Sequence, residues 1–240
     1  MKFLALFLSL LRWDVLRELR RKETLANMTL FAVLVLFVAK IGIGQGLDRE
    51  SQELDQTSTV GPVMFWISIL FAGTVGLSQT FAAEREGNTL GGIVTAPIDV
   101  GVFYLAKVAS TWFYVMIMEL LALAVYSILF DFSPWEHLGM LLLVISVFTF
   151  AYIGLGVILA AMTTALRGGG EVLLRILLFP LMIPLIWLTL LVSQRVFDTT
   201  IAGGALGPPL EFRVYLAAGL AFDALYLTAG YLLFPKVLEE

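Results

Sequence analysis

The feature that most constrains this sequence is a series of long apolar stretches with few charges inside them. A helix needs about 20 apolar residues to cross the hydrocarbon core of a bilayer. The stretches are continuous and lack the polar alternation of barrel strands, so they predict membrane-spanning helices. Six stretches reach this length, at 25–44, 61–83, 103–130, 137–163, 172–193 and 213–234.

The composition agrees with an all-α integral membrane protein. The 240 residues are 60% hydrophobic and 14% charged, whereas soluble domains are about half apolar and a quarter charged. We expect one transmembrane permease domain, 1–240, with an interfacial helix at 1–23 and a six-span bundle at 25–234. The lipid bilayer is the first expected partner, and no nucleic acid is expected.

The residues with metal and redox chemistry are scarce. There is no cysteine, which excludes disulfides and thiolate catalysis. The single histidine, His137, could supply a metal with only one imidazole, so we expect no metal site. Two interpretations of His137 stay open, an anchor at the membrane interface and an axial haem ligand.

The N-terminal segment 3–23 differs from the six spans. Arg17, Arg20 and Arg21 cluster at helical spacing, and Trp13 lies nearby. This pattern predicts a basic amphipathic helix in the membrane surface. The segment lacks the small-residue cleavage site of a signal peptide, so we expect it to be retained. The alternative is that the segment is the flank of a longer first span.

Lys and Arg residues near the spans predict the orientation, because cytoplasmic flanks carry the excess of positive charge. With six spans and the N-terminus inside, eleven basic residues fall on the inner side and four on the outer side, which places both termini in the cytoplasm. The inner set is Lys2, Arg12, Arg17, Arg20, Arg21, Lys22, Arg85, Lys107, Arg167, Arg175 and Lys236. The outer set is Lys40, Arg49, Arg195 and Arg213.

Two connections between spans are distinctive. The outer segment 196–212 is rich in Gly and Pro, and we expect an irregular or re-entrant piece there. The inner segment 84–97 carries Leu90, Ile93 and Val94 at i, i+3 and i+4, the apolar face of a short helix that Pro97 would end. Such a helix could dock into a groove on a cytoplasmic partner. It could equally be a connector that packs on its own bundle.

Two carboxylic acids interrupt the spans. Glu119 lies deep in the third span and Asp223 midway along the sixth. Placing Asp at the bilayer centre costs about 2.5–3.5 kcal/mol on insertion scales, so such residues normally face a bundle interior or a wet cavity. They are candidates for a substrate or proton pathway. The alternative is that each is a neutral group in a helix-packing hydrogen bond.

The fifth span contains Pro180 and Pro184, one turn apart. Each proline removes a backbone donor and crowds the preceding turn, so we expect the helix to bend or break there. The bend could belong to a mobile, cavity-lining helix or be a static kink.

The glycine-rich turn before the fifth span is not a phosphate loop. A Walker A motif requires G-x-x-x-x-G-K-[ST], but Glu171 follows Gly168-Gly169-Gly170 here. The chain therefore carries no recognisable ATPase motif, and we expect it not to be an enzyme by itself.

Two blocks of residues carry a resemblance to a known family. The first is Glu84-Arg85-Glu86, Leu90, Gly92, Ala96-Pro97 and Lys107. The second is Arg167-Gly168-Gly169, an apolar run, Pro180-Leu181 and Ile183-Pro184-Leu185. In their order and spacing they resemble the B-subunit permease of the haem-exporter ABC transporter of cytochrome c maturation, and the resemblance covers nearly the whole chain.

The resemblance implies a permease in the bacterial cytoplasmic membrane that works with a separate cytoplasmic ATP-binding subunit. Residues 84–97 would be the coupling helix that enters that subunit. A second copy of the chain, haem-handling membrane subunits and a periplasmic haem chaperone would complete the system. The chain alone would bind no cofactor, haem would be the candidate substrate, and ATP would bind to the partner.

Two other functions are compatible with the residues. One is an ABC-2-type permease for another substrate, such as a lipid or drug. The other is an ion-coupled secondary transporter that uses Glu119 and Asp223, although the inverted repeats typical of that class are not apparent.

Overall fold

The computed structural model describes residues 2–45, 53–82, 84, 99–164, 170–202 and 209–239. Within these ranges the regular elements are all helices. They are α1 (Lys2–Arg21), α2 (Glu23–Gln45), α3 (Glu53–Gln79), α6 (Val100–Leu129), the short 3₁₀ turn η1 (Pro134–His137), α7 (Leu138–Thr164), α8 (Gly170–Ala202) and α9 (Pro209–Glu239).

Six of these helices, α2, α3, α6, α7, α8 and α9, are long and apolar enough to cross a membrane. This confirms the all-α class and the six predicted spans. Several helices begin before or end after the predicted apolar stretches, since a helix satisfies its own backbone wherever it runs. In particular, α8 reaches Ala202 and α9 begins at Pro209. Most of the segment predicted to be irregular, 196–212, is therefore helical, and 203–208 lies outside the described residues.

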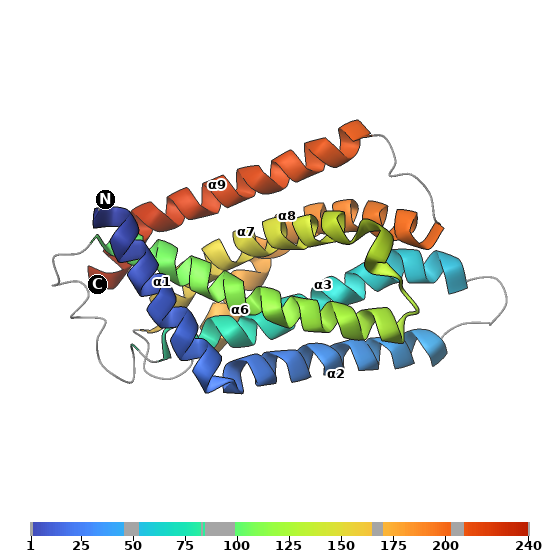
Figure 1. Ribbon diagram of the computed structural model, residues 1–240, viewed down its shortest axis with the longest axis horizontal. Coiled ribbons are helices and arrows are strands. Elements are labelled where there is room, and N and C mark those ends of the chain that lie inside the picture. The colour runs from blue at the N-terminus through green and yellow to red at the C-terminus, as the bar shows by residue number, and fades with distance from the viewer. Residues whose placement is uncertain are drawn as a thin grey trace.

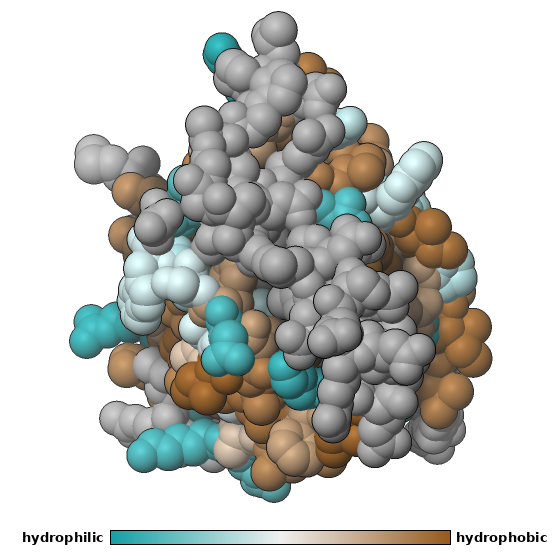
Figure 2. Space-filling model, turned by 90° about the vertical axis from the view of Figure 1, so that its right-hand side faces the viewer, coloured by the Kyte–Doolittle hydropathy of each residue, from teal (hydrophilic) through white to brown (hydrophobic). Residues whose placement is uncertain are grey.

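The spans form a bundle in which α3 and α7 are the most buried and α2 and α9 the least. Helix α9 packs along α7, α2 packs along α3, and α8 packs against α7 and α3. The two marked ends of the chain lie at the same end of the bundle, where α1 crosses it obliquely (Figure 1). Figure 2 views the bundle from the opposite end, and many of the described residues around its sides are hydrophobic.

Helix α1 is a separate element and not the flank of the first span. Lys22 joins α1 to α2 with a φ of 48°, a left-handed backbone conformation that interrupts the helix. The chain changes direction at this residue, and α1 then packs chiefly on α6. Its exposed leucines, Leu4, Leu8 and Leu16, fit the predicted contact with the membrane surface.

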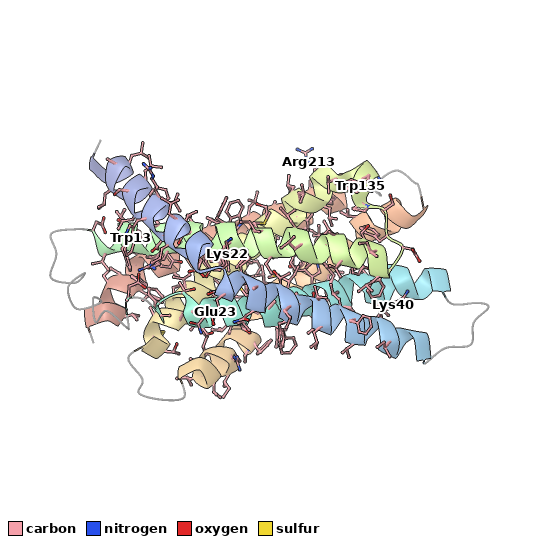
Figure 3. All side chains as sticks on the ribbon, turned by 60° about the horizontal axis from the view of Figure 1, so that its bottom comes forward. Trp13, Lys22, Glu23, Lys40, Trp135 and Arg213 are labelled. Carbon is pink, nitrogen blue, oxygen red and sulfur yellow. The ribbon has the colours of Figure 1, made fainter. Side chains whose placement is uncertain are left out.

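Exposed tryptophans lie toward both ends of the bundle. Trp13 on α1 is 59% exposed and Trp135 in η1 is 75% exposed, and Figure 3 shows them at opposite ends. Tryptophan is enriched at both interfaces of a membrane because its ring is apolar and its N–H is polar. Their separation therefore agrees with a bundle that spans the bilayer lengthwise.

Near the α1 end, α9 is held by an aromatic cluster. The ring of Phe234 lies against those of Phe81, Phe103 and Tyr104. The Tyr104 hydroxyl donates to the carbonyl of Gly154 at 2.8 Å. A Cβ at Gly230 would collide with the same hydroxyl, so this glycine lets α9 approach α6 and α7 closely.

Helix α8 passes through Pro180 and Pro184 without interruption. The break that the prolines were expected to cause does not occur. Membrane helices tolerate proline because neighbouring helices and local adjustments satisfy the freed carbonyls. A bend at these residues stays a prediction.

Candidate functional site

The predicted coupling segment begins at Glu84, which the structure describes. Its other predicted residues lie outside the described ranges, as does the cytoplasmic turn Arg167-Gly168-Gly169. The residues that are not described are Arg85, Glu86, Leu90, Gly92, Ile93, Val94 and Pro97. The site is therefore built from the two described residues that border the segment 85–98, Glu84 and Asp99.

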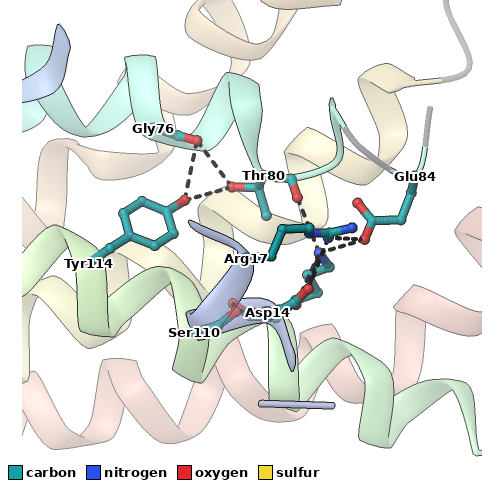
Figure 4. Close-up of polar contacts among 8 residues, drawn as sticks. Asp14, Arg17, Gly76, Thr80, Glu84, Ser110 and Tyr114 are labelled. Carbon is teal, nitrogen blue, oxygen red and sulfur yellow. Dashed lines mark hydrogen bonds and ion pairs between the residues drawn. The ribbon is translucent and has the colours of Figure 1, made fainter. Parts of the chain in front are cut away.

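Glu84 belongs to a group of four charged residues, Asp14, Arg17, Glu84 and Lys107, which we call the ionic cluster (Figure 4). Its Oε1 accepts from Lys107 Nζ at 2.8 Å and from Arg17 Nη2 at 2.8 Å. Asp14 accepts from the same two groups, at 3.0 Å from Lys107 Nζ and 3.0 Å from Arg17 Nη2. Helices α1 and α6 are thus joined through charges to the chain that follows α3.

Lys107 is the centre of the ionic cluster. Its side chain is 3% exposed, and its ammonium has three acceptors: Asp14, Glu84 and the Thr80 carbonyl at 3.3 Å. An ammonium group has three N–H donors, so these acceptors match its full capacity. The rings of Phe81 and Phe103 each lie 5.6 Å from Nζ and add cation–π contacts.

The ionic cluster is neutral as a whole, with two positive and two negative residues. Burial by itself raises the pKa of the Glu84 carboxyl. Attraction to Lys107, together with hydrogen bonds from Lys107 and Arg17, outweighs burial and holds that pKa below its usual value. Glu84 is therefore an anion at neutral pH. Removing one member of such a buried set costs about 3–5 kcal/mol, because it leaves a buried charge uncompensated.

A small polar pocket adjoins the ionic cluster between α1, α3 and α6. Tyr114 and Thr80 share a hydrogen bond at 3.3 Å on its wall, and both hydroxyls contact the Gly76 carbonyl. Glu18 on α1 also lines the pocket. This end of the bundle thus holds a polar region beside α1, and α1 also exposes Leu4, Leu8 and Leu16, with Arg12 among them.

The other border of the segment 85–98 is also fixed. Asp99 caps α6, where its Oδ1 accepts from the Gly101 amide at 2.8 Å. Its Oδ2 accepts from the Tyr231 hydroxyl on α9 at 2.9 Å. One border is thus attached to α1 and α6 through Glu84, and the other to α6 and α9 through Asp99.

Sequence reasoning found part of this site. Glu84 and Lys107 stood out in the first matching block, but their contact was not predicted. Asp14, Asp99 and Tyr231 were missed. A signal for Asp14 does exist, since it lies three residues before Arg17 on a helix whose other face is apolar.

The two acids within the spans are buried, as predicted. Glu119 is fully buried and accepts from the Thr149 hydroxyl of α7, while its Oε2 has no hydrogen-bond partner among the described residues. Asp223 on α9 is 8% exposed, and its Oδ1 likewise lacks a described partner. The structure describes no cation paired with either acid.

A second pocket, mostly apolar, lies beside the Glu119–Thr149 contact. It lies between α3, α7 and α8. Thr149 lines this pocket and donates to Glu119 behind it. Trp66 also lines it, and its indole N–H donates to Ser193 of α8 at 2.7 Å. The pocket therefore combines apolar walls with a few fixed polar groups.

Comparison of the amino-acid sequence with known proteins identifies a family. The chain matches the family model described as CcmB protein over residues 5–229. The chain belongs to the CcmB family. The match includes the ionic cluster, Asp99, both intramembrane acids and the two prolines of α8. It confirms the resemblance found in the sequence.

Three curated relatives of this CcmB-family chain carry the name Heme exporter protein B. The one from Pseudomonas aeruginosa is 29% identical over 167 residues, which is 70% of this chain and 71% of the relative. The Paracoccus denitrificans protein is 27% identical over 78% of this chain and 79% of the relative. The Bradyrhizobium diazoefficiens protein is 25% identical over 82% and 85%. With its six apolar helices, this CcmB-family member is a multi-pass protein of the bacterial inner membrane.

Proposed function

We propose that this chain is the membrane permease subunit of an ABC transporter that exports or delivers haem in cytochrome c biogenesis, and that a separate cytoplasmic subunit supplies the ATPase. Membership in the CcmB family is the observation that carries the proposal. The name of its relatives, Heme exporter protein B, supports haem as the transported molecule.

The ATP-binding partner would dock on the segment Glu84–Pro97, with Leu90, Ile93 and Val94 as the apolar contact face. When that partner binds ATP and closes, it would push on this segment. Glu84 and Asp99 are bound to α1, α6 and α9, so motion of the segment would reach all three helices. The position of both marked chain ends beside α1 supports a common cytoplasmic side for the termini.

The remaining partners follow from the same function. A second copy of the chain would complete the transporter core, and haem-handling membrane subunits would pass haem to a periplasmic haem chaperone. Haem would be the transported substrate of the complex, and ATP would bind to the partner subunit.

The docking proposal is tested with Leu90→Asp and Ile93→Asp. Charges on the apolar face would weaken the groove contact, so both variants are expected to insert normally but to lose the co-purifying ATP-binding subunit. Asn88→Asp is the matched control, because position 88 lies off the Leu90–Val94 face at helical spacing. Undiminished co-purification with both variants would rule out this docking surface.

We also propose that Glu119 and Asp223 belong to the transport pathway. The support is the pocket between α3, α7 and α8, whose Thr149 contacts Glu119. Glu119→Gln keeps the shape of the side chain and an oxygen that can accept from the Thr149 hydroxyl. Thr149→Val instead removes the hydroxyl that donates to Glu119. A pathway role predicts that Glu119→Gln lowers haem delivery while leaving the complex assembled. Full delivery by the variant would assign Glu119 to packing alone.

A further inference from the structure

The ionic cluster raises a question that membrane anchoring does not answer. Helix α1 exposes Leu4, Leu8 and Leu16, apolar residues of the kind that hold an amphipathic helix at a bilayer surface. Yet α1 also places Asp14 at 8% exposure against Lys107 at 3%. Burying a charged pair is often no more stabilising than apolar residues of the same volume, so the charges call for a reason besides stability.

The geometry connects α1 to one residue in particular. Arg17 donates to Glu84 at 2.8 Å, and Asp14 binds the ammonium of Lys107, whose other N–H bond goes to Glu84. Glu84 is therefore held from two sides, by α1 directly and by α6 through Lys107. Arg17 is itself fixed, because the Trp13 ring lies 4.1 Å from its guanidinium carbon.

Directional, charge-assisted hydrogen bonds fix position better than apolar contacts do. Apolar contacts would allow the chain at position 84 to slide against α6 and α1. The paired charges instead specify one arrangement, in which Glu84 occupies a single site between two cations. The same reasoning applies to buried polar groups that fix helix register.

We propose that Asp14, Arg17 and Lys107 are positioning residues for ATPase coupling, and that α1 is part of the coupling device through its hold on Glu84. This inference rests on the proposed function, since it assumes that an ATP-binding partner acts on the segment that Glu84 begins. The exposed leucines of α1 contact the membrane surface, and the ionic cluster binds α1 to Glu84. Motion that the partner imposes at Glu84 would therefore move α6 and α1 together.

The test uses three variants of the assembled complex: Asp14→Leu, Lys107→Met and the double variant. Each single change leaves an unbalanced buried charge, so both are expected to lower the melting temperature and the yield. The double variant restores neutrality and leaves the Arg17–Glu84 pair in place. It is expected to recover yield and melting temperature.

The rate of haem-dependent ATP turnover distinguishes a positioning role from a structural one. The double variant still lacks the Lys107–Glu84 bond, so its haem-dependent ATP turnover is expected to stay reduced, by about fivefold or more, while the ATP-binding subunit co-purifies in normal amount. Turnover that recovers together with the melting temperature would overturn the inference and make the cluster purely structural.

A parallel Leu90→Asp complex distinguishes the two proposals. If Leu90→Asp loses the partner and the double variant turns over ATP normally, docking stands and only the positioning role is wrong. If Leu90→Asp keeps the partner, docking on this segment is wrong, and the positioning role that depends on it is overturned as well.

Discussion

The Lys107 ammonium on α6 lies 2.8 Å from Oε1 of Glu84, and the two side chains are only 3% and 4% exposed. This contact fixes the start of the predicted coupling segment to the third span. The same ammonium also contacts Asp14, which brings the N-terminal helix to the same point. A salt bridge in this location therefore links α1, α6 and the start of the predicted coupling segment, and it is more than a surface pair.

Replacing Lys107 with Met is expected to destabilise the protein by about 3–5 kcal/mol, because Asp14 and Glu84 would then share one cation between them. Thermal unfolding of the detergent-purified protein measures the change. Lys40→Met is the matched control, since Lys40 is exposed toward the other end of α2. Equal melting temperatures for the two variants would contradict the buried pairing.

The pH dependence of stability should show the lowered pKa of Glu84. A carboxyl whose pKa is depressed by folding stabilises the folded state above its unfolded pKa, and this contribution is lost as pH falls through the folded pKa. The stability difference between wild type and Glu84→Gln is thus expected to be constant from pH ~6 to ~8 and to shrink only in acid. Chemical unfolding at several pH values measures it. A difference that vanishes already near neutral pH would mean that Glu84 is not held as an anion.

The close approach of α9 to α6 predicts that Gly230→Ala destabilises the bundle by about 1–3 kcal/mol through overpacking against Tyr104. Gly139→Ala is the control, because nothing lies within 4 Å of a Cβ at that position. Melting temperatures of both variants report the difference. A Cβ at position 230 would meet ring carbons of Tyr104 as well as its hydroxyl. Tyr104→Leu removes both, so Gly230→Ala should cost less stability in that background, and an equal cost in the two backgrounds would argue against this packing.

The predicted orientation is open to direct labelling, because the chain has no cysteine of its own. Glu23, Lys40 and Arg213 are exposed, and Figure 3 shows Glu23 where α1 meets α2 and Lys40 further along α2. In intact cells, an impermeant maleimide is expected to label Lys40→Cys and Arg213→Cys but not Glu23→Cys. Permeabilised cells should label all three. Labelling of Glu23→Cys alone from outside would invert the topology and remove the partner from the segment 84–97.

The sequence by itself determined the class of protein and the positions of its spans. Length and apolarity of a stretch are local properties, and a bilayer acts on each stretch separately, so six helices followed from counting. The separate N-terminal helix followed in the same way, from a basic cluster directly after a short apolar run. Even the burial of Glu119 and Asp223 was predictable, since lipid excludes a carboxylic acid on any exposed face.

Only the tertiary structure decided which charges meet. Asp14 and Lys107 are 93 residues apart, and Arg17 and Glu84 are 67 apart. Their contact depends on how α1 crosses α6, which in turn depends on the left-handed backbone at Lys22. No local pattern encodes a crossing angle. It results from the packing of whole helices, so the ionic cluster becomes apparent only when the bundle is assembled.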